Sequence, residues 1–201
     1  MLDRVPTAPG EFLALADYLA DFRQEFERGG DVFTKFERRQ TFREPGDASW
    51  EAFAAGDWPT AMERNEADRP EAAAMVARYR TFGYVPQRIR VVEFPISPYL
   101  QWEMQFLRLL AEQGQDLRVL RAEQLSDLEH AGLLPEVVLL GDRVLYEVDY
   151  DATGTVTGGR RIEDREVIAG CRAQLARLFE QGEPLSTFFD AHVAPLPAPA
   201  V

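Results

Sequence analysis

The sequence has few of the residues that carry nucleophilic or metal-dependent chemistry. Its 201 residues contain one cysteine, Cys171, two histidines, His130 and His192, and one lysine, Lys35. A single cysteine excludes an internal disulfide bond and a cysteine-rich zinc site. The chain also lacks paired His-Lys phosphodiesterase motifs, a Gly-Lys phosphate loop and a G-x-S-x-G signature. The sequence therefore predicts no metal centre and no cofactor.

Positive charge and long apolar runs are also scarce. Lys and Arg total 22 against 34 Asp and Glu, a net charge of −12. Such an envelope repels nucleic-acid backbones and anionic membranes, so we expect no direct nucleic-acid partner. No apolar run approaches the ~18 residues of a membrane span, and the start of the chain lacks the pattern of a signal peptide. We expect a cytoplasmic protein that contacts no membrane.

Apolar residues are plentiful by comparison. They make up 46% of the chain, and 11% of it is aromatic, enough for a packed core without a covalent staple. With no repeat and no clear linker, the sequence predicts an N-terminal arm over residues 1–10, one domain over 11–194, and a Pro-rich, disordered or extended tail over 195–201. Residues 57–70 are polar, and we expect a loop or a partly helical segment there.

Hydrophobic periodicity predicts an α+β domain. A strand over 86–94, a helix over 97–113 and a strand over 116–121 form a central βαβ unit with a parallel strand pair. Gly141-Asp142 lies between apolar runs and predicts a hairpin, so the sheet is expected to be mixed, with helices packed on it. The other expected strands cover 31–39, 136–140, 143–150 and 155–161, and the other helices cover 11–28, a short segment around Trp50, 71–82, 122–131 and 163–181.

The helix over 97–113 carries one carboxylate in an unusual position. Ser97 is its expected N-cap, with Pro98 in the first turn. At 100° per residue, Glu103 falls near the centre of the apolar arc, where an unpaired charge is too costly. Arg88 or Arg90 on the preceding strand, or Arg118 or Arg121 on the following one, could form a buried ion pair with Glu103. Alternatively, Glu103 lines a pocket, or the helix is rotated and its side chain reaches water.

Two aromatic residues accompany Glu103. Tyr99 and Trp102 lie one turn apart on the same arc, a spacing more typical of core than of a ligand platform. If Glu103 lines a pocket, they form its walls and offer O–H and N–H donors. The candidate binding residues are then Arg88, Arg90, Tyr99, Trp102 and Glu103.

A second carboxylate is a candidate site residue only under the hypothesis that the protein is an enzyme. Glu147 and Asp149 share one face of the strand over 143–150, a pattern compatible with general acid–base chemistry. A solvated face of an edge strand is the favoured interpretation. The candidate catalytic residues under the enzyme hypothesis are Glu103 and Asp149.

Several stretches resemble an actinobacterial family described as domain of unknown function six-eight-seven-nine. They are FTKFERRQTFREPGD, QRIRVVEFPISPYLQWEM, GQDLRVL, and GDRVLYEVDYDATG with the helix after it, spanning about Phe12 to Asp190. Tyr99, Trp102 and Glu103 match the start of a family helix, and Gln101 replaces its usual arginine. The resemblance implies genes near helix-turn-helix regulators, and hence a regulatory or interaction role.

Three functions follow as hypotheses. The first, which the resemblance implies and which agrees with an acidic protein without a visible nucleophile, is a non-enzymatic regulatory protein that binds a protein partner, such as a DNA-binding regulator. The second is a small-molecule enzyme or sensor with Glu103 as pocket carboxylate and an arginine and aromatic lining. The third is self-association, as a homodimer, through the first helix or Trp50 and Trp58.

Overall fold

Apolar runs of the sequence fold into one eight-stranded sheet with helices on both faces. The computed structural model describes residues 1–200. The strands are β1 (Glu11–Ala14), β2 (Val32–Glu37), β3 (Val85–Val92), β4 (Asp116–Arg121), β5 (Val137–Leu140), β6 (Val144–Tyr150), β7 (Val156–Ile162) and β8 (Glu183–Pro184). The helices are η1 (Leu2–Thr7), α1 (Leu15–Glu27), α2 (Ala48–Ala54), α3 (Trp58–Ala67), α4 (Arg69–Thr81), α5 (Pro98–Glu112), η2 (Ala122–Leu125), α6 (Arg165–Gln181), α7 (Leu185–Phe188) and η3 (Phe189–Val193).

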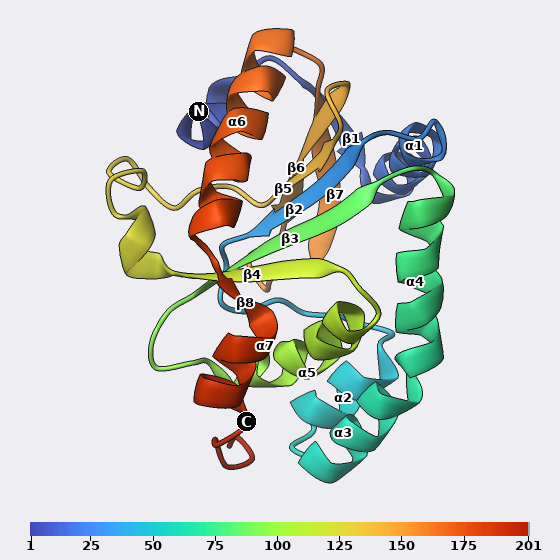
Figure 1. Ribbon diagram of the computed structural model, residues 1–201, viewed down its shortest axis with the longest axis vertical. Coiled ribbons are helices and arrows are strands. Elements are labelled where there is room, and N and C mark those ends of the chain that lie inside the picture. The colour runs from blue at the N-terminus through green and yellow to red at the C-terminus, as the bar shows by residue number, and fades with distance from the viewer. Residues whose placement is uncertain (201) are drawn as a thin grey trace.

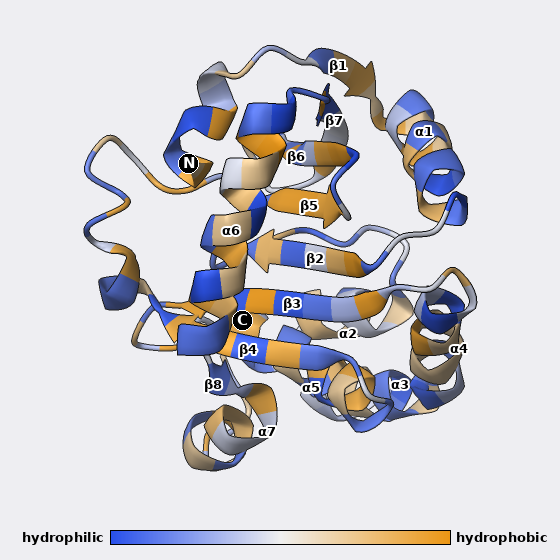
Figure 2. Ribbon diagram, turned by 45° about the horizontal axis from the view of Figure 1, so that its top comes forward, coloured by the Kyte–Doolittle hydropathy of each residue, from blue (hydrophilic) through white to orange (hydrophobic). Residues whose placement is uncertain are grey.

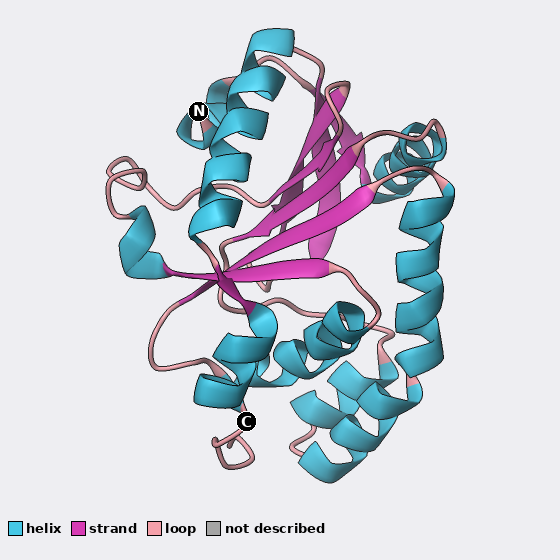
Figure 3. Cartoon of the chain, viewed as in Figure 1, coloured by secondary structure: helices cyan, strands magenta, loops and turns pink. Residues whose placement is uncertain are grey.

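The sheet is mixed, in the order β1-β7-β6-β5-β2-β3-β4-β8. β2, β3 and β4 run parallel, and the other neighbouring strands are antiparallel. The predicted α+β class is confirmed, as is the parallel pair β3 and β4 joined by α5 (Figures 1 and 3). The predicted hairpin is the antiparallel pair β5 and β6. Ser97 caps α5 as expected, because its Oγ accepts the Leu100 N–H at 3.1 Å.

Three predicted elements differ from the structure. The segment expected to be helical from residue 11 begins as β1, because residues 11–14 pair with β7 before α1 starts. The polar segment 57–70 is helical: Asp57 caps α3, and α4 follows almost directly. The helix expected over 122–131 is reduced to the single turn η2.

Helices cover the two faces of the sheet unequally. α6 and η1 lie on one face, and α1, α4 and α5 lie on the other (Figure 1). The α6 face buries one apolar cluster, in which Phe36, Ile89 and Val137 are fully buried. On the opposite side, one cluster lies under α1 and α4, one lies around α5, and a third lies between α5 and the α2–α3 pair. Figure 2 shows hydrophilic segments interrupting β3. These segments hold the candidate site.

The two ends of the chain lie against helices. The Gln174 side chain on α6 accepts the Leu2 N–H at 2.8 Å, and Leu2 and Val5 of the predicted arm are buried. In the predicted tail, the Pro197 carbonyl accepts a hydrogen bond from the Gln101 side chain of α5 at 2.6 Å. The prediction for Val201 lies outside the described residues.

Candidate functional site

Charged side chains project from the parallel strands toward α5. Lys35 on β2 pairs in register with Arg88 on β3, and Glu37 with Arg90. Because side chains alternate along a strand, the intervening Phe36 and Ile89 face α6 instead. The charged residues thus separate the two apolar clusters on the α5 face.

Glu103 meets the guanidinium of Arg90. Arg90 Nε donates to Glu103 Oε2 at 2.8 Å, and Arg90 Nη1 donates to the Arg39 carbonyl at 2.5 Å. Arg90 is fully buried and Glu103 is 8% exposed. Of the partners predicted for Glu103, the structure selects Arg90. Glu103 also lines a cavity, so the ion pair and the pocket, considered as alternatives from the sequence, occur together.

Burial disfavours the charged form of both members of this pair, and only for Arg90 do the neighbouring charges overcome it. It raises the pKa of Glu103, and the positive charge of Arg90 counteracts it only in part. Burial also opposes the charge of Arg90, but the carboxylates of Glu103, Glu37 and Glu136 outweigh it and raise the Arg90 pKa. Arg90 is therefore a permanent cation at the base of the site.

Glu37 carries a negative charge between the cations of the site. Its Oε1 lies 2.6 Å from Lys35 Nζ, and its Oε2 lies 3.4 Å from Arg88 Nη1. Although burial opposes ionisation, the cations Arg88, Lys35 and Arg90 hold the Glu37 pKa at about 2. Glu37 Oε2 and Arg88 Nε are both buried without a hydrogen-bond partner. Buried polar atoms in proteins are nearly always paired, so these two are candidates for ligand contacts.

Two adjoining cavities open at these residues. Both are lined by Lys35, Glu37, Glu44 and Arg88, which we call the charged centre. The cavity we call the aromatic lobe, of about 300 Å³, is also lined by Tyr18, Phe22, Phe33, Phe42, Tyr79 and Tyr150. The cavity we call the polar lobe, of about 180 Å³, is also lined by Asp47, Asn65, Tyr99, Trp102, Glu103 and Phe106. Together the lobes form one cleft over β2 and β3.

The predicted aromatic pair lies at the polar lobe. Tyr99 Oη donates to Glu44 Oε1 at 3.1 Å, and Trp102 Nε1 donates to Ser49 Oγ at 2.9 Å. Both rings are buried in an apolar cluster that we call the Phe53 cluster; its other buried members are Phe42, Ala52, Phe53 and Ala61. Tyr99 and Trp102 are therefore core residues that also form a cavity wall, and their polar atoms already have protein partners. Burial raises the pKa of Glu44.

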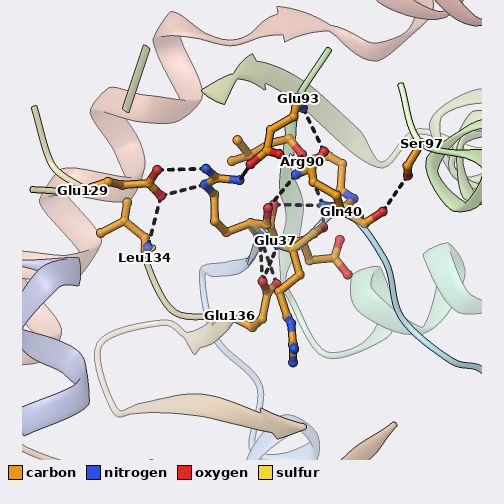
Figure 4. A network of polar contacts seen from close by, with 11 residues as sticks. Glu37, Gln40, Arg90, Glu93, Ser97, Glu129, Leu134 and Glu136 are labelled. Atoms are coloured by element: carbon orange, nitrogen blue, oxygen red, sulfur yellow. Dashed lines mark hydrogen bonds and ion pairs between the residues drawn. The ribbon is translucent and has the colours of Figure 1, made fainter. Parts of the chain in front are cut away.

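A polar network lies where the chain leaves β2 and β3, next to the charged residues of the site (Figure 4). The Arg38 guanidinium pairs with Glu129 and Glu93, at 2.6 Å each. Glu136 accepts the backbone N–H groups of Arg38 and Arg39 at 2.9 and 2.7 Å. Burial raises the pKa of Glu136 to about 7, against the opposing charge of Arg90. These contacts fix the chain as it leaves β2 and turns toward Glu44.

The structure does not bring Asp149 to Glu103. Val148 lines the aromatic lobe, so Glu147 and Asp149 lie on the other face of β6. There Glu147 pairs with Arg160 at 2.5 Å. β6 is also not an edge strand, since it lies between β5 and β7. A solvated edge was therefore the wrong interpretation of this segment.

The residues of the site that sequence reasoning missed include Lys35, Glu37, Glu44 and Asn65, and all the rings of the aromatic lobe. Lys35 and Glu37 had a usable signal, because the chain's one lysine lies two residues before a glutamate on a predicted strand. Glu44 and Asn65 had none. They reach the cleft from a loop and from α3, through contacts distant in sequence.

Other kinds of site are not found among the described residues. Within residues 1–200, no three His, Cys, Asp or Glu side chains are grouped so as to hold a metal ion. No helix in this range has both the length and the apolarity needed to cross a membrane.

Fold and site together define an α+β domain with a charged cleft over its parallel strands. The sequence matches the family described as Domain of unknown function (DUF6879) over residues 20–190, and the chain belongs to that family. This confirms the domain-of-unknown-function family that the sequence resembles. No curated protein matches the chain.

Two solved structures are similar at low identity. One is a phospholipase D family member, Nuc from Salmonella typhimurium, with a TM-score of 0.47 and 8% identity, covering 88% of this chain and 98% of that one. The other is TrmBL2, an archaeal chromatin protein, with a TM-score of 0.43 and 11% identity, covering 87% of this chain and 52% of that one. At this level of similarity neither carries an argument about function.

Proposed function

We propose that the cleft binds a small molecule with a carboxylate or phosphate group and that the protein is a ligand-binding sensor. The observation that supports this most is the state of Arg88. It is 9% exposed, its Nε has no hydrogen-bond partner, and it lines both lobes beside Lys35. A buried guanidinium atom without a partner is costly, and a carboxylate or phosphate oxygen supplies the missing acceptor.

The position of Lys35 gives such an anion a way in. Its side chain is 28% exposed, whereas that of Arg88 is 11% exposed. An anion entering the cleft meets Lys35 first and then Arg88. The protein's net charge of −12 repels anions at long range, so selectivity rests on these two close contacts.

The other functions suggested by the sequence stay predictions. A partner-binding regulator is compatible with a sensor, since ligand occupancy can control a partner surface. Acid–base catalysis would use the Glu103 carboxylate, which already accepts a hydrogen bond from Arg90. Self-association through Trp50 and Trp58 must use rings that are partly buried against the Phe53 cluster.

The test uses two probe anions, benzoate and inorganic phosphate. Ligand-observed NMR on the full chain should detect binding of at least one of them. Lys35→Met should weaken it by about tenfold or more, since a charge-assisted contact is lost. Arg177→Met on the exposed surface of α6 is the matched control and should leave binding unchanged. Absence of binding by both probes, or equal affinity for Lys35→Met and wild type, would overturn the proposal.

A further inference from the structure

The two lobes of the cleft offer opposite chemistry to a ligand. The aromatic lobe has rings on several sides: Phe42 and Tyr150 lie 4.8 Å apart between centroids, and Phe22 and Phe33 lie 6.5 Å apart, edge to face. Such walls favour a flat apolar body. Charged side chains lie directly beside them at the charged centre. A ligand that fills the cleft therefore needs an apolar ring attached to a polar head.

Two atoms of the charged centre that have no hydrogen-bond partner indicate which chemical groups the polar head must carry. Arg88 Nε is a donor that needs an acceptor, and Glu37 Oε2 is an acceptor that needs a donor. Both belong to residues that line both lobes. The Arg88–Glu37 contact of 3.4 Å is longer than a good hydrogen bond. A head group with both a carboxylate and an amino group supplies one partner to each residue.

We infer that the cleft binds an aromatic amino acid or a close analogue. The ring occupies the aromatic lobe, the carboxylate accepts from Arg88 and Lys35, and the amino group donates to Glu37. This inference rests on the proposed function, and it adds an amino group and an aromatic ring to the anionic group that Arg88 and Lys35 would bind. The aromatic lobe alone, at about 300 Å³, is at the lower end of the size of small-molecule sites.

The opposite charges of the head explain why the lining is not simply basic. The Glu37 carboxylate lies between the cationic groups of Lys35 and Arg88, at 2.6 and 3.4 Å, and Glu44 and Glu103 add further carboxylates. For a plain anion, an ionised glutamate between the two cations weakens binding without abolishing it. For a zwitterion, the same glutamate contributes to binding, so the site prefers acids that also carry an amino group.

Calorimetric titration of the full chain with four compounds tests the inference. L-Phenylalanine carries ring, carboxylate and amino group. 3-Phenylpropionate lacks the amino group, phenethylamine lacks the carboxylate, and L-alanine lacks the ring. We expect phenylalanine to bind at least about tenfold more tightly than each of the others. Equal binding of 3-phenylpropionate and phenylalanine would overturn the role of Glu37.

A cavity-filling variant tests where the ring lies. Val156 on β7 lines the aromatic lobe and is half-buried, so Val156→Phe should fill the lobe and abolish phenylalanine binding. The adjacent Thr157 is exposed, and Thr157→Phe is the matched control that should bind as wild type does. Unchanged phenylalanine binding by Val156→Phe would contradict the inference.

The outcomes separate this inference from the proposed function. Binding of benzoate or phosphate that depends on Lys35, without preference for phenylalanine, overturns the inference and leaves the proposed function intact. Absence of binding by every probe overturns both. Circular dichroism of Val156→Phe and Thr157→Phe checks that both variants fold before their affinities are compared.

Discussion

The two faces of the central strands contrast sharply in composition. Toward α6, Phe36, Ile89 and Val91 are apolar and fully buried. Toward α5, the neighbouring positions Lys35, Arg88 and Arg90 on the same strands are charged. Both faces are covered by helices, so burial alone does not separate them. The α6 face is an ordinary core, whereas the α5 face gives up apolar contact to hold charge at a cavity.

The difference indicates which face serves function. Burying ions costs more than burying apolar side chains unless every ion is paired. Arg90 and Glu103 form an ion pair, yet Arg88 Nε, Glu37 Oε2 and Arg90 Nη2 are all buried without a hydrogen-bond partner. Incomplete pairing therefore runs through the charged cluster on the α5 face, including the residues that line the cleft. A fold selected only for stability would place apolar residues there.

The largest expected effect is on the free energy of unfolding, and it compares a buried ion pair with a surface ion pair on the same helix. Glu103→Gln leaves the buried Arg90 without its carboxylate and should lower the free energy of unfolding by ~3–5 kcal/mol. Glu112→Gln on the exposed side of α5, where Glu112 pairs with Arg69 and Arg108, should cost ~0–1 kcal/mol. Urea denaturation measures both. Similar losses for the two variants would contradict the contrast between the faces.

The next effect is a fall in stability with rising pH. Glu136 has a pKa of about 7 when folded, against an ordinary value of 4.5, so the folded state holds a proton that the unfolded chain releases between these values. Its contribution is fully present below pH 4.5 and is lost as pH rises through 7, by about 3 kcal/mol at most. Urea denaturation from pH 4.5 to 8 should show this fall.

Replacing Glu136 checks the source of that fall. Glu136→Gln should flatten the profile between pH 4.5 and 7, because the titrating group is gone. Glu180→Gln, at an exposed position on α6, is the control and should keep the wild-type profile. A Glu136→Gln protein with the wild-type slope would assign the pH dependence to other groups.

The smallest expected effect is on the α6 face. Ile89→Val removes one methylene from a fully buried position and should cost ~0.5–1.5 kcal/mol in the free energy of unfolding. Probe-anion binding should not change, since Ile89 points away from the cleft. A change in affinity beyond about tenfold would show that the two faces are coupled through β3.

Strong local patterns made part of this structure predictable. The α5 helix with its Ser97 cap, the βαβ unit and the β5–β6 hairpin follow from periodicity and turn residues, and Glu103 stood out because it broke the pattern of its helix. Local patterns failed where pairing distant in sequence decides the outcome. Phe12 continues a helical period yet lies in β1, because the backbone there pairs with β7.

The site was predictable only in part for the same reason. Arg88, Arg90 and Glu103 share one βαβ unit, so their proximity follows from local topology. Glu44 and Asn65 reach the same cleft from segments whose positions depend on the whole fold. A single sequence specifies the residues of one supersecondary unit far better than those that join it from elsewhere.

The sheet ends on both sides in very short strands. β1 has four residues and β8 has two, and these are the outermost strands of the sheet. Long unpaired edges are templates for strand addition and aggregation, and short ones offer little to an incoming chain. The short outer strands therefore favour docking of a second copy or another chain through helices and loops over extension of the sheet.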